Sequence, residues 1–229
     1  MSIADNIKTV MDRIASAAKQ AGRDPASVRL VVVTKTIDHE RIKEAAGAGA
    51  TIFGENRVQE AKEKIEKLGN IASWHLIGHL QVNKAKHAVK LFDLIHSVDN
   101  RELASEINKQ AAKIGKVQNV LVEVNIAGEA SKAGMAVKEA PTLVREIAGL
   151  KHITIQGLMT MPPYSENPED SRPYFCVLKE LAQSITREGI PGVSLKELSM
   201  GMSGDFEIAI EEGATMVRVG TAIFGERQA

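Results

Sequence analysis

The sequence has few of the residues on which several classes of protein depend. Its single cysteine, Cys176, excludes an internal disulfide and favours a reducing compartment. Aromatic residues make up only 3% of the chain, which argues against the stacking surfaces that bind single-stranded nucleic acid. The 29 basic and 29 acidic side chains balance, so no global field attracts nucleic acid or an anionic membrane. We therefore expect neither of these partners.

Two further absences concern localisation and metal chemistry. Charged residues interrupt the apolar residues of the N-terminal segment, so it resembles neither a signal peptide nor a membrane span. No Cys/His cluster has the spacing of a zinc site. With 44% hydrophobic and 25% charged residues, the 229-residue chain has the composition of an ordinary globular protein. We expect a cytoplasmic protein without a metal, and we expect it to act as a monomer.

Short apolar runs alternate along the chain with longer amphipathic segments. The apolar runs predict eight strands, over residues 28–34, 50–54, 73–77, 94–98, 119–124, 153–159, 195–199 and 216–219. Helical periodicity predicts one helix before the first strand, over about 3–22, and a helix after every strand except the last. These helices are expected over 38–48, 58–68, 81–91, 99–115, 138–149, 171–188 and 205–212.

Repeated strand–helix units predict a parallel sheet in an α/β fold. Eight units in a chain of this length predict a closed (β/α)₈ TIM barrel, which forms a single domain over residues 1–229. The extra N-terminal helix would cover the flank that lacks an eighth helix. The alternative is an open doubly wound sheet. Such a sheet usually has a glycine-rich first turn, and the turn at Lys35 contains no glycine.

Lys35 directly follows the first predicted strand, whose β-branched residues indicate burial on both faces. The carboxyl ends of barrel strands form the face on which ligands bind. A lysine desolvated at that face can form a Schiff base with a carbonyl compound. The same position also suits a lysine whose ammonium group simply reaches solvent from a strand end. Lys35 alone therefore leaves both interpretations open.

The segment 199–205 places two serines and two glycines between a predicted strand and a predicted helix. Such a segment exposes backbone N–H groups beside a helix N-terminus and suits an anion. Gly220 and Thr221 form a second small turn after the last strand, and loops at these two positions commonly hold phosphate in barrels. Ordinary turn chemistry, with Ser203 or Asp205 as a helix N-cap, explains the same composition.

Arg218 lies within the last predicted strand, where a buried guanidinium requires a partner. That partner is either a carboxylate or an acceptor on a ligand. A Schiff-base lysine, a phosphate site and an inward arginine together suggest pyridoxal phosphate, with Arg218 facing the pyridine nitrogen. His75 and His79 suit a structural role at least as well as a ligand contact. Met159 is typical of apolar filling, although a methionine can pack on a flat ring.

Several motifs occur in order along nearly the whole chain. They are VTKT at 33–36, FGENRVQE at 53–60, WHLIGHLQ at 74–81, the segment 125–134, GLM at 157–159, LSMGMS at 198–203 and RVGT at 218–221. Together they resemble the pyridoxal-phosphate homeostasis protein family, the single-domain relatives of the N-terminal barrel of alanine racemase. A proline often follows the Lys-Thr pair in that family, and here Ile37 and Asp38 stand instead.

The resemblance implies a fold-type III barrel that holds pyridoxal phosphate as an aldimine on Lys35. It implies that Asn56, His75 and Met159 line the ring and that Arg218 faces its nitrogen. It further implies that the phosphate is surrounded by Ser199, Gly201, Met202, Gly220 and Thr221. The implied function is to bind, buffer and deliver the cofactor to apo-enzymes that depend on it, without a turnover of its own.

The residues themselves leave two enzymatic alternatives open. Racemisation needs an acid or base on each face of the substrate carbon, and Lys35 supplies only one of them. Tyr164 lies in the loop after the sixth strand, so a low racemase activity remains an alternative. A class I aldolase-like barrel, in which Lys35 captures a sugar phosphate without a cofactor, is the other. Solvent exposure explains the charges of Glu129 and Lys132 in the loop after the fifth strand. Lys132 is also a candidate for a second cofactor site.

Overall fold

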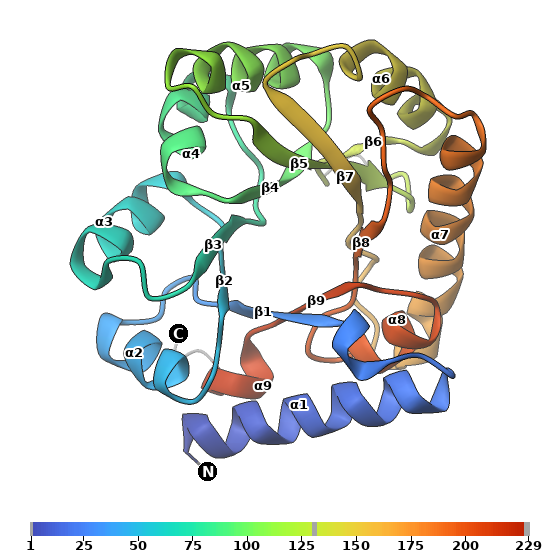
Figure 1. Ribbon diagram of the computed structural model, residues 1–229. Coiled ribbons are helices and arrows are strands. Elements are labelled where there is room, and N and C mark those ends of the chain that lie inside the picture. Colours follow the sequence, from blue (N-terminus) through green and yellow to red (C-terminus); the bar gives the residue numbers. More distant parts are fainter. Residues whose placement is uncertain (1, 130–131, 227–229) are drawn as a thin grey trace.

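Parallel strands close into a barrel in the computed structural model, which describes residues 2–129 and 132–226 (Figure 1). Each barrel strand pairs with its neighbour, and the last strand pairs in parallel with the first. In order around the ring, the strands are β1 (Arg29–Val33), β2 (Ile52–Glu55), β3 (Ser73–Leu76), β4 (Leu94–Val98), β5 (Gln118–Asn125), β7 (Ile153–Met159), β8 (Glu197–Ser199) and β9 (Met216–Val219). The predicted (β/α)₈ barrel is confirmed.

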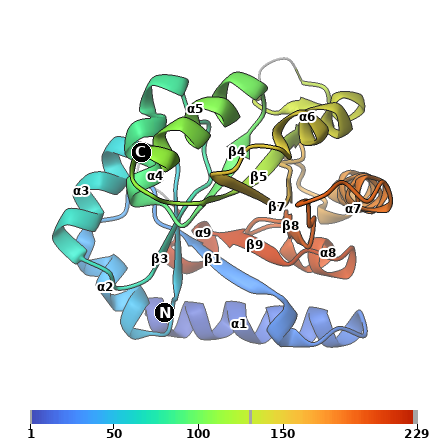
Figure 2. The same cartoon turned by 45° about the horizontal axis from the view of Figure 1, so that its top comes forward.

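The helices form an outer layer around the strands (Figure 2). They are α1 (Ile3–Gln20), α2 (His39–Gly47), α3 (Val58–Leu68), α4 (Ala85–Leu91), α5 (Arg101–Lys113), α6 (Ala140–Ile147), α7 (Arg172–Arg187), α8 (Phe206–Glu211) and α9 (Thr221–Phe224). They form because apolar residues recur on one face of a helix and are buried in the core. Short 3₁₀ turns lead into three of them and precede β1, at Val82–Lys84, Val137–Glu139, Pro168–Ser171 and Pro25–Ser27.

The structure differs from the sequence prediction at two short elements. A helix, α9, does follow the last barrel strand, where the sequence predicted none. A two-residue strand, β6 (Met135–Ala136), pairs with β5 in the segment predicted as a loop before a helix. Both elements are shorter than the windows over which hydrophobic periodicity can be recognised.

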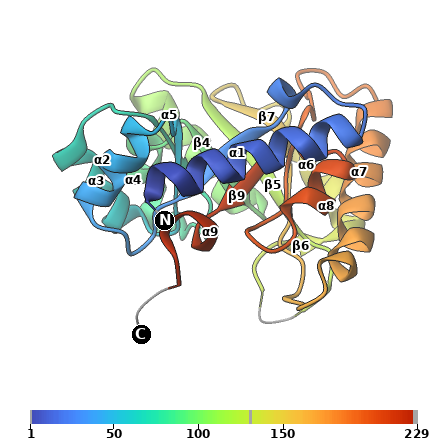
Figure 3. The same ribbon diagram turned by 90° about the horizontal axis from the view of Figure 1, so that it is seen from below.

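The N-terminal helix α1 packs against α2, α8 and α9, on the side of the barrel where β1 meets β9 (Figure 3). Ser2 begins this helix with a reciprocal capping box to Asp5. The Asn6 amide donates a hydrogen bond of 2.8 Å to the Ile223 carbonyl of α9. The short α9 and the long α1 together therefore cover the flank that the sequence predicted α1 would cover alone.

The barrel interior is filled by apolar side chains from most of its strands: Val31, Ile52, Ile77, Leu94, Leu121, Met159 and Met216. Gly157 marks the tightest approach between two strands, because a Cβ atom there would lie 1.8 Å from the Glu197 carbonyl oxygen. A larger apolar core lies between the strands and the helices. Within the described ranges, no helix is both long enough and apolar enough to cross a membrane.

Candidate functional site

A cavity of about 290 Å³ lies at the carboxyl ends of β1, β8 and β9. Its size is close to ~300 Å³, the lower end of the range for small-molecule sites. Five of the residues predicted for the site line it: Lys35, Met202, Arg218, Gly220 and Thr221. The loop after β7 adds Pro163, Tyr164 and Ser165, and α9 adds Phe224. The strand ends therefore meet as the barrel prediction requires.

Lys35 occupies a turn between β1 and α2 and is partly exposed. The Ile37 amide closes this turn by donating to the Thr34 carbonyl at 3.0 Å. Thr36 has a φ of 64°, and it is the one non-glycine residue with a positive φ in the described part of the chain. Since β-branched residues rarely adopt that conformation, the neighbouring structure must enforce it.

Arg218 lies beneath the cavity, on β9, with 3% of its surface exposed. Its guanidinium donates to the Ser199 hydroxyl at 2.6 Å and to the Thr160 carbonyl at 2.9 Å. Burial lowers the pKa of Arg218 to about 10, so the side chain still carries its charge at neutral pH. Arg218 is thus a fixed, charged hydrogen-bond donor in the wall of the cavity.

A chain of hydrogen bonds continues from Arg218 into the barrel. Ser199 lies 2.9 Å from Nδ1 of His96, whose Nε2 lies 3.1 Å from Nδ1 of His75. Burial lowers the pKa of His75 to about 4 and that of His96 well below its ordinary value, so both rings are neutral at pH 7. Because Arg218 can only donate, the Ser199 hydroxyl is free to donate to His96, which then donates to His75.

Glu123 is a buried acid of β5 that the sequence analysis did not single out. Burial raises its pKa to about 7; Asp99 adds to this effect, and Arg218 opposes it. Its Oε2 atom has no hydrogen-bond partner among the described residues. The sequence signal that marks Arg218, a charged residue within an apolar strand, marks Glu123 as well and could have found it.

We expect Glu123→Gln to change how stability depends on pH. The folded state holds the Glu123 proton up to about pH 7, whereas an unfolded glutamate releases it near its ordinary pKa of 4.5. The free energy of unfolding of the wild type should therefore fall, relative to the variant, as the pH rises between these values. The total difference should be about 3 kcal/mol. Urea unfolding of both proteins from pH 5 to 8 measures it, and parallel curves would contradict a raised pKa.

The loops after β8 and β9 form another part of the cavity wall. The Met202 amide donates to Asp205 at 2.6 Å, and the Ser171 hydroxyl donates to the same carboxylate at 2.9 Å. The amides of Gly220 and Ala222 both donate to the Ser203 hydroxyl, each at 3.3 Å. Two backbone N–H groups therefore converge on one oxygen atom at the cavity wall, which is the arrangement that an anion requires.

Gly201 supports this wall from behind. Its φ is 89°, and a Cβ atom would lie 2.5 Å from the Ala209 Cβ. Glycine is thus required here for the close approach of the loop to α8 and for its backbone conformation. Gly201 is not among the residues that line the cavity, and its predicted place beside a phosphate stays a prediction.

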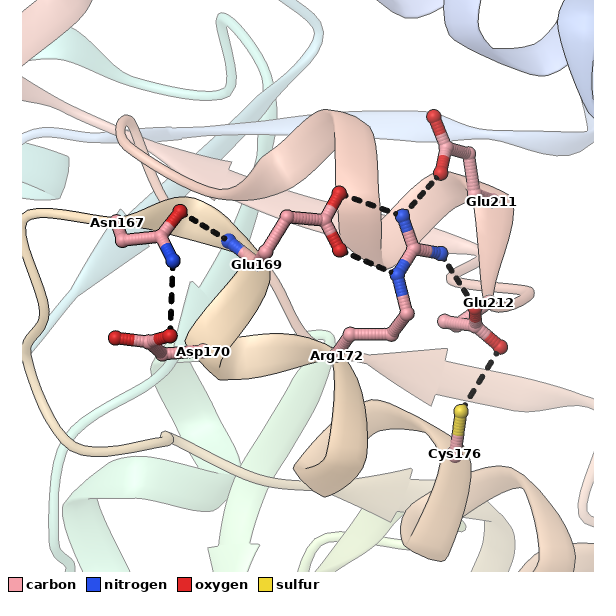
Figure 4. Close-up of polar contacts among 7 residues, drawn as sticks. All are labelled: Asn167, Glu169, Asp170, Arg172, Cys176, Glu211 and Glu212. Atoms are coloured by element: carbon pink, nitrogen blue, oxygen red, sulfur yellow. Dashed lines mark hydrogen bonds and ion pairs between the residues drawn. The ribbon is translucent and has the colours of Figure 1, made fainter.

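An ion-pair network joins the loop after β7 to α8 (Figure 4). Arg172 binds Glu169 in a fork at 2.7 and 2.9 Å, and it also contacts Glu211 at 2.7 Å and Glu212 at 2.6 Å. Hydrogen bonds from these carboxylates, Glu169 first, raise the pKa of Arg172. The Cys176 thiol donates to Glu212 at 3.1 Å. Because residues of the loop and the segment just before α8 both line the cavity, the network helps to fix the relative position of these two parts of its wall.

The structure places the other predicted residues outside the cavity wall. His75, Met159 and Ser199 are buried inside the barrel. Asn56 lines a separate hollow beside the turn after β3, where a Cβ on Gly78 would lie 2.5 Å from the Asn56 carbonyl. His79, in the same turn, lies 3.8 Å from Asp99.

Residues that the predicted set omitted also line the cavity: Val33, Ile37, Ser171, Ser203, Gly204, Asp205, Phe224 and Gly225. Of these, Ser203, Gly204 and Asp205 belong to the segment predicted to bind an anion. The others carry no signal, because apolar and small residues in loops are too common to mark a site.

Tyr164 and Lys132, whose roles the sequence left undecided, lie at or near the cavity. Tyr164 lines it and is 89% exposed. Lys132 pairs with Glu129 at 3.1 Å and donates to the Pro162 carbonyl, also at 3.1 Å. Lys132 is therefore attached to the loop that forms one wall.

Comparison with known proteins identifies related chains. The family model of the alanine racemase N-terminal domain matches residues 3–228. The pyridoxal phosphate homeostasis protein of Aquifex aeolicus is 46% identical over 229 residues, which cover all of both chains. The protein of that name from Pseudomonas aeruginosa is 40% identical over 227 residues, covering 99% of this chain and 96% of the relative.

Solved structures agree with these matches. PipY of Synechococcus elongatus, whose structure has pyridoxal phosphate bound, is 36% identical with a TM-score of 0.83, covering 94% of this chain and 100% of PipY. Alanine racemase of Clostridium difficile shares the fold, with a TM-score of 0.74 and 18% identity, over 98% of this chain and 58% of the racemase. The chain therefore belongs to the alanine racemase N-terminal domain family and, within it, to the pyridoxal phosphate homeostasis proteins.

Proposed function

We propose that the protein binds pyridoxal 5′-phosphate and takes part in its homeostasis, holding the cofactor and handing it on to apo-enzymes. The observation that carries this proposal is the convergence of Lys35, Arg218 and the Gly220 turn on one cavity. The names of the Aquifex and Pseudomonas relatives and the cofactor in PipY support it.

The residues present fit each part of this cofactor. The Lys35 amine, once deprotonated, can condense with the cofactor's aldehyde to form a Schiff base and release one water molecule. Arg218, a charged donor, would face the pyridine nitrogen and keep it an unprotonated acceptor. The amides of Gly220 and Ala222, which now donate to Ser203, would donate to the phosphate. Met202 and Thr221 would complete this side of the site.

We propose that the predicted residues inside the barrel affect the bound cofactor mainly through the residues that they contact. Ser199 receives a hydrogen bond from Arg218 and is next to His96, so we propose that it orients the guanidinium rather than the phosphate. His75 ends the same chain of hydrogen bonds. Met159 would lie below the ring as part of the interior, and Asn56 would shape the adjoining turn.

We propose that binding, rather than turnover, is the function. Lys35 supplies a base on one face of a bound substrate, and Tyr164 is the one phenol among the residues that line the cavity. Its exposure favours a mobile solvent contact over a fixed proton donor. A low racemase activity that uses Tyr164 is the second candidate, because this side chain does border the cavity.

Three further expectations belong to the proposal. Residues 1–229 would form one domain, because β1 and β9 pair and close a ring that includes both ends of the chain. The protein would act as a monomer, as the sequence analysis expects. It would work in the cytoplasm, where Cys176 stays reduced.

A transfer assay tests the proposed function. Protein loaded with pyridoxal phosphate and then desalted is mixed with an apo-enzyme and with a phosphatase that destroys free cofactor. Direct delivery predicts that the enzyme gains activity despite the phosphatase, whereas Lys35→Ala protein treated in the same way delivers nothing. Loss of all transfer in the presence of phosphatase would contradict delivery. Steady racemisation by the wild type that disappears in Tyr164→Phe would establish the second candidate instead.

A further inference from the structure

A buried lysine lies directly behind the turn that carries Lys35. Lys64 belongs to α3, and its side chain is only 5% exposed. Its ammonium group donates to Glu55 at 2.7 Å, to Glu60 at 2.6 Å and to the Thr34 carbonyl at 2.6 Å. All three N–H bonds of the ammonium therefore have acceptors. None of Lys64, Glu55 and Glu60, which we call the Lys64 cluster, is among the residues that line the cavity.

The acceptors of this cluster also hold the two neighbours of Lys35. The Thr34 hydroxyl donates to Glu55 at 2.6 Å. On the other side, the Thr36 amide donates to Glu60 at 2.5 Å. The residues before and after Lys35 are thus both tied to one group of charges, while Lys35 itself lines the cavity.

The Thr36 conformation explains why such ties are required. A threonine with a φ of 64° is unfavourable by itself, so the turn would relax to another backbone conformation if nothing opposed it. The bond from the Thr36 amide to the Glu60 carboxylate is charge-assisted, and such bonds are stronger than neutral ones. It is therefore the contact best suited to hold the turn.

The charges of the Lys64 cluster affect the pKa values of its two carboxylates. Burial raises the pKa of Glu55, and the nearby Lys64 ammonium opposes that rise. Burial acts on Glu60 in the same direction, but the hydrogen bonds from Lys64 and from the Thr36 amide outweigh it and leave its pKa lowered. Glu60 consequently stays an anion, and thus a strong acceptor for the Thr36 amide, at neutral pH.

We propose that Lys64, Glu55 and Glu60 are positioning residues for Lys35. They fix the backbone on both sides of Lys35, so that its amine enters the cavity at one defined place before any aldehyde binds. The inference rests on the proposed function, because it assigns to Lys35 the reaction with the cofactor's aldehyde. It adds that the rate of this reaction is set by residues outside the cavity.

Three variants on one helix test the proposal. Glu60→Ala removes the acceptor of the Thr36 amide, while Glu60→Gln keeps an acceptor oxygen in its place. Glu63→Ala is the matched control, because Glu63 is exposed on the same helix and, among the described residues, has a hydrogen bond only from Gln59 of α3, at 3.5 Å. Thermal unfolding of all three checks that each variant is folded, and the partial exposure of Glu60 makes its replacement tolerable.

The first measurement uses the protein without cofactor. Hydrogen exchange of the Thr36 amide should become about tenfold faster in Glu60→Ala, the effect of losing a hydrogen bond to a charged group. Glu60→Gln keeps an acceptor without the charge, so its rate should lie between those of the wild type and Glu60→Ala. The rate in Glu63→Ala should stay close to that of the wild type. The second measurement follows the visible absorbance after pyridoxal phosphate is added. Its rise should be about tenfold slower in Glu60→Ala and partly restored in Glu60→Gln, because a small misplacement of a reacting group is costly.

Each result decides a separate question. Faster Thr36 exchange with an unchanged rate of cofactor attachment would overturn the proposal, since the cluster would then hold the turn without positioning Lys35. Unchanged exchange in Glu60→Ala would also overturn it. A wild-type protein that never develops the absorbance would instead contradict the proposed function. The exchange data would then show separately whether the cluster fixes the turn.

Discussion

Protein in which Lys35 is replaced by alanine should retain no visible absorbance after pyridoxal phosphate is added and the free cofactor is removed by desalting, whereas the wild type should retain it. The reason is that the proposed Schiff base requires the primary amine of Lys35, which lines the cavity. Contacts from Arg218 and from the phosphate loops would remain, so weak binding should persist. A loss of about 3 kcal/mol would lower the apparent affinity by roughly 100-fold. Reduction with borohydride and peptide mass spectrometry locate the attached group on the wild-type chain.

Lys132→Ala provides the matched control for this experiment. Lys132 is a lysine near the same cavity, attached to the Pro162 carbonyl of the loop that forms one wall. If Lys35 is the site of attachment, the Lys132 variant should keep the absorbance and the labelled Lys35 peptide. Absorbance that survives in Lys35→Ala and disappears in Lys132→Ala would instead assign the attachment to Lys132.

Gly157→Ala should have the largest effect on stability of any single methyl group added to this chain. The new Cβ would stand 1.8 Å from the Glu197 carbonyl oxygen and 2.6 Å from the carbonyl carbon. Those atoms belong to the backbone of β8, so β7 and β8 would have to separate where they pair. Overpacking of this kind should lower the free energy of unfolding by about 3 kcal/mol or more. Urea unfolding monitored by circular dichroism measures the change.

Gly47→Ala separates a local clash from a general effect of removing glycine. Gly47 ends α2 with a helical conformation, and a Cβ atom there meets nothing within 4 Å. This variant should be as stable as the wild type or more stable by up to about 1 kcal/mol. A Gly157→Ala protein of wild-type stability would mean that β7 and β8 can move apart at little cost, contrary to the closed ring.

The sequence predicted the barrel because its strands are buried on both faces and its helices on one face. The continuous apolar run at 30–33 and the helical spacing of Ile3, Ile7, Val10 and Ile14 led directly to β1 and α1. The boundaries differ by a few residues where 3₁₀ turns lead into helices, since periodicity does not distinguish such a turn from the helix it precedes.

The candidate site was predictable only in part. Lys35, Arg218 and Gly220 could be assigned to one face from their places at strand ends, and the structure brings them together. Ser199 and Met159 lie side by side in the strand register, yet both face the interior. How far a side chain lies below the end of a strand depends on the stagger of the strands, which the sequence does not show. Their assignment as contacts of the cofactor stays a prediction.

The Lys64 cluster shows a second limit. Glu60 and Lys64 are four residues apart on a charged helix, which is the spacing of an ordinary surface ion pair. Only the structure shows that Lys64 points inward to Glu55 and to the turn at Lys35. A pattern of charges along a helix therefore does not reveal which of them is buried.

The pairing of β1 with β9 has a consequence for how the protein is made. Lys35 follows β1, and Arg218 belongs to the neighbouring strand β9. The ribosome therefore adds these two residues of the cavity wall more than 180 positions apart in the chain. A chain still being elongated by the ribosome holds the lysine without the arginine and the Gly220 turn. Contacts between such distant segments form late in folding, after the intervening units have been ordered. Only a finished chain would therefore bind the ligand tightly, and chains interrupted during translation would leave it in solution.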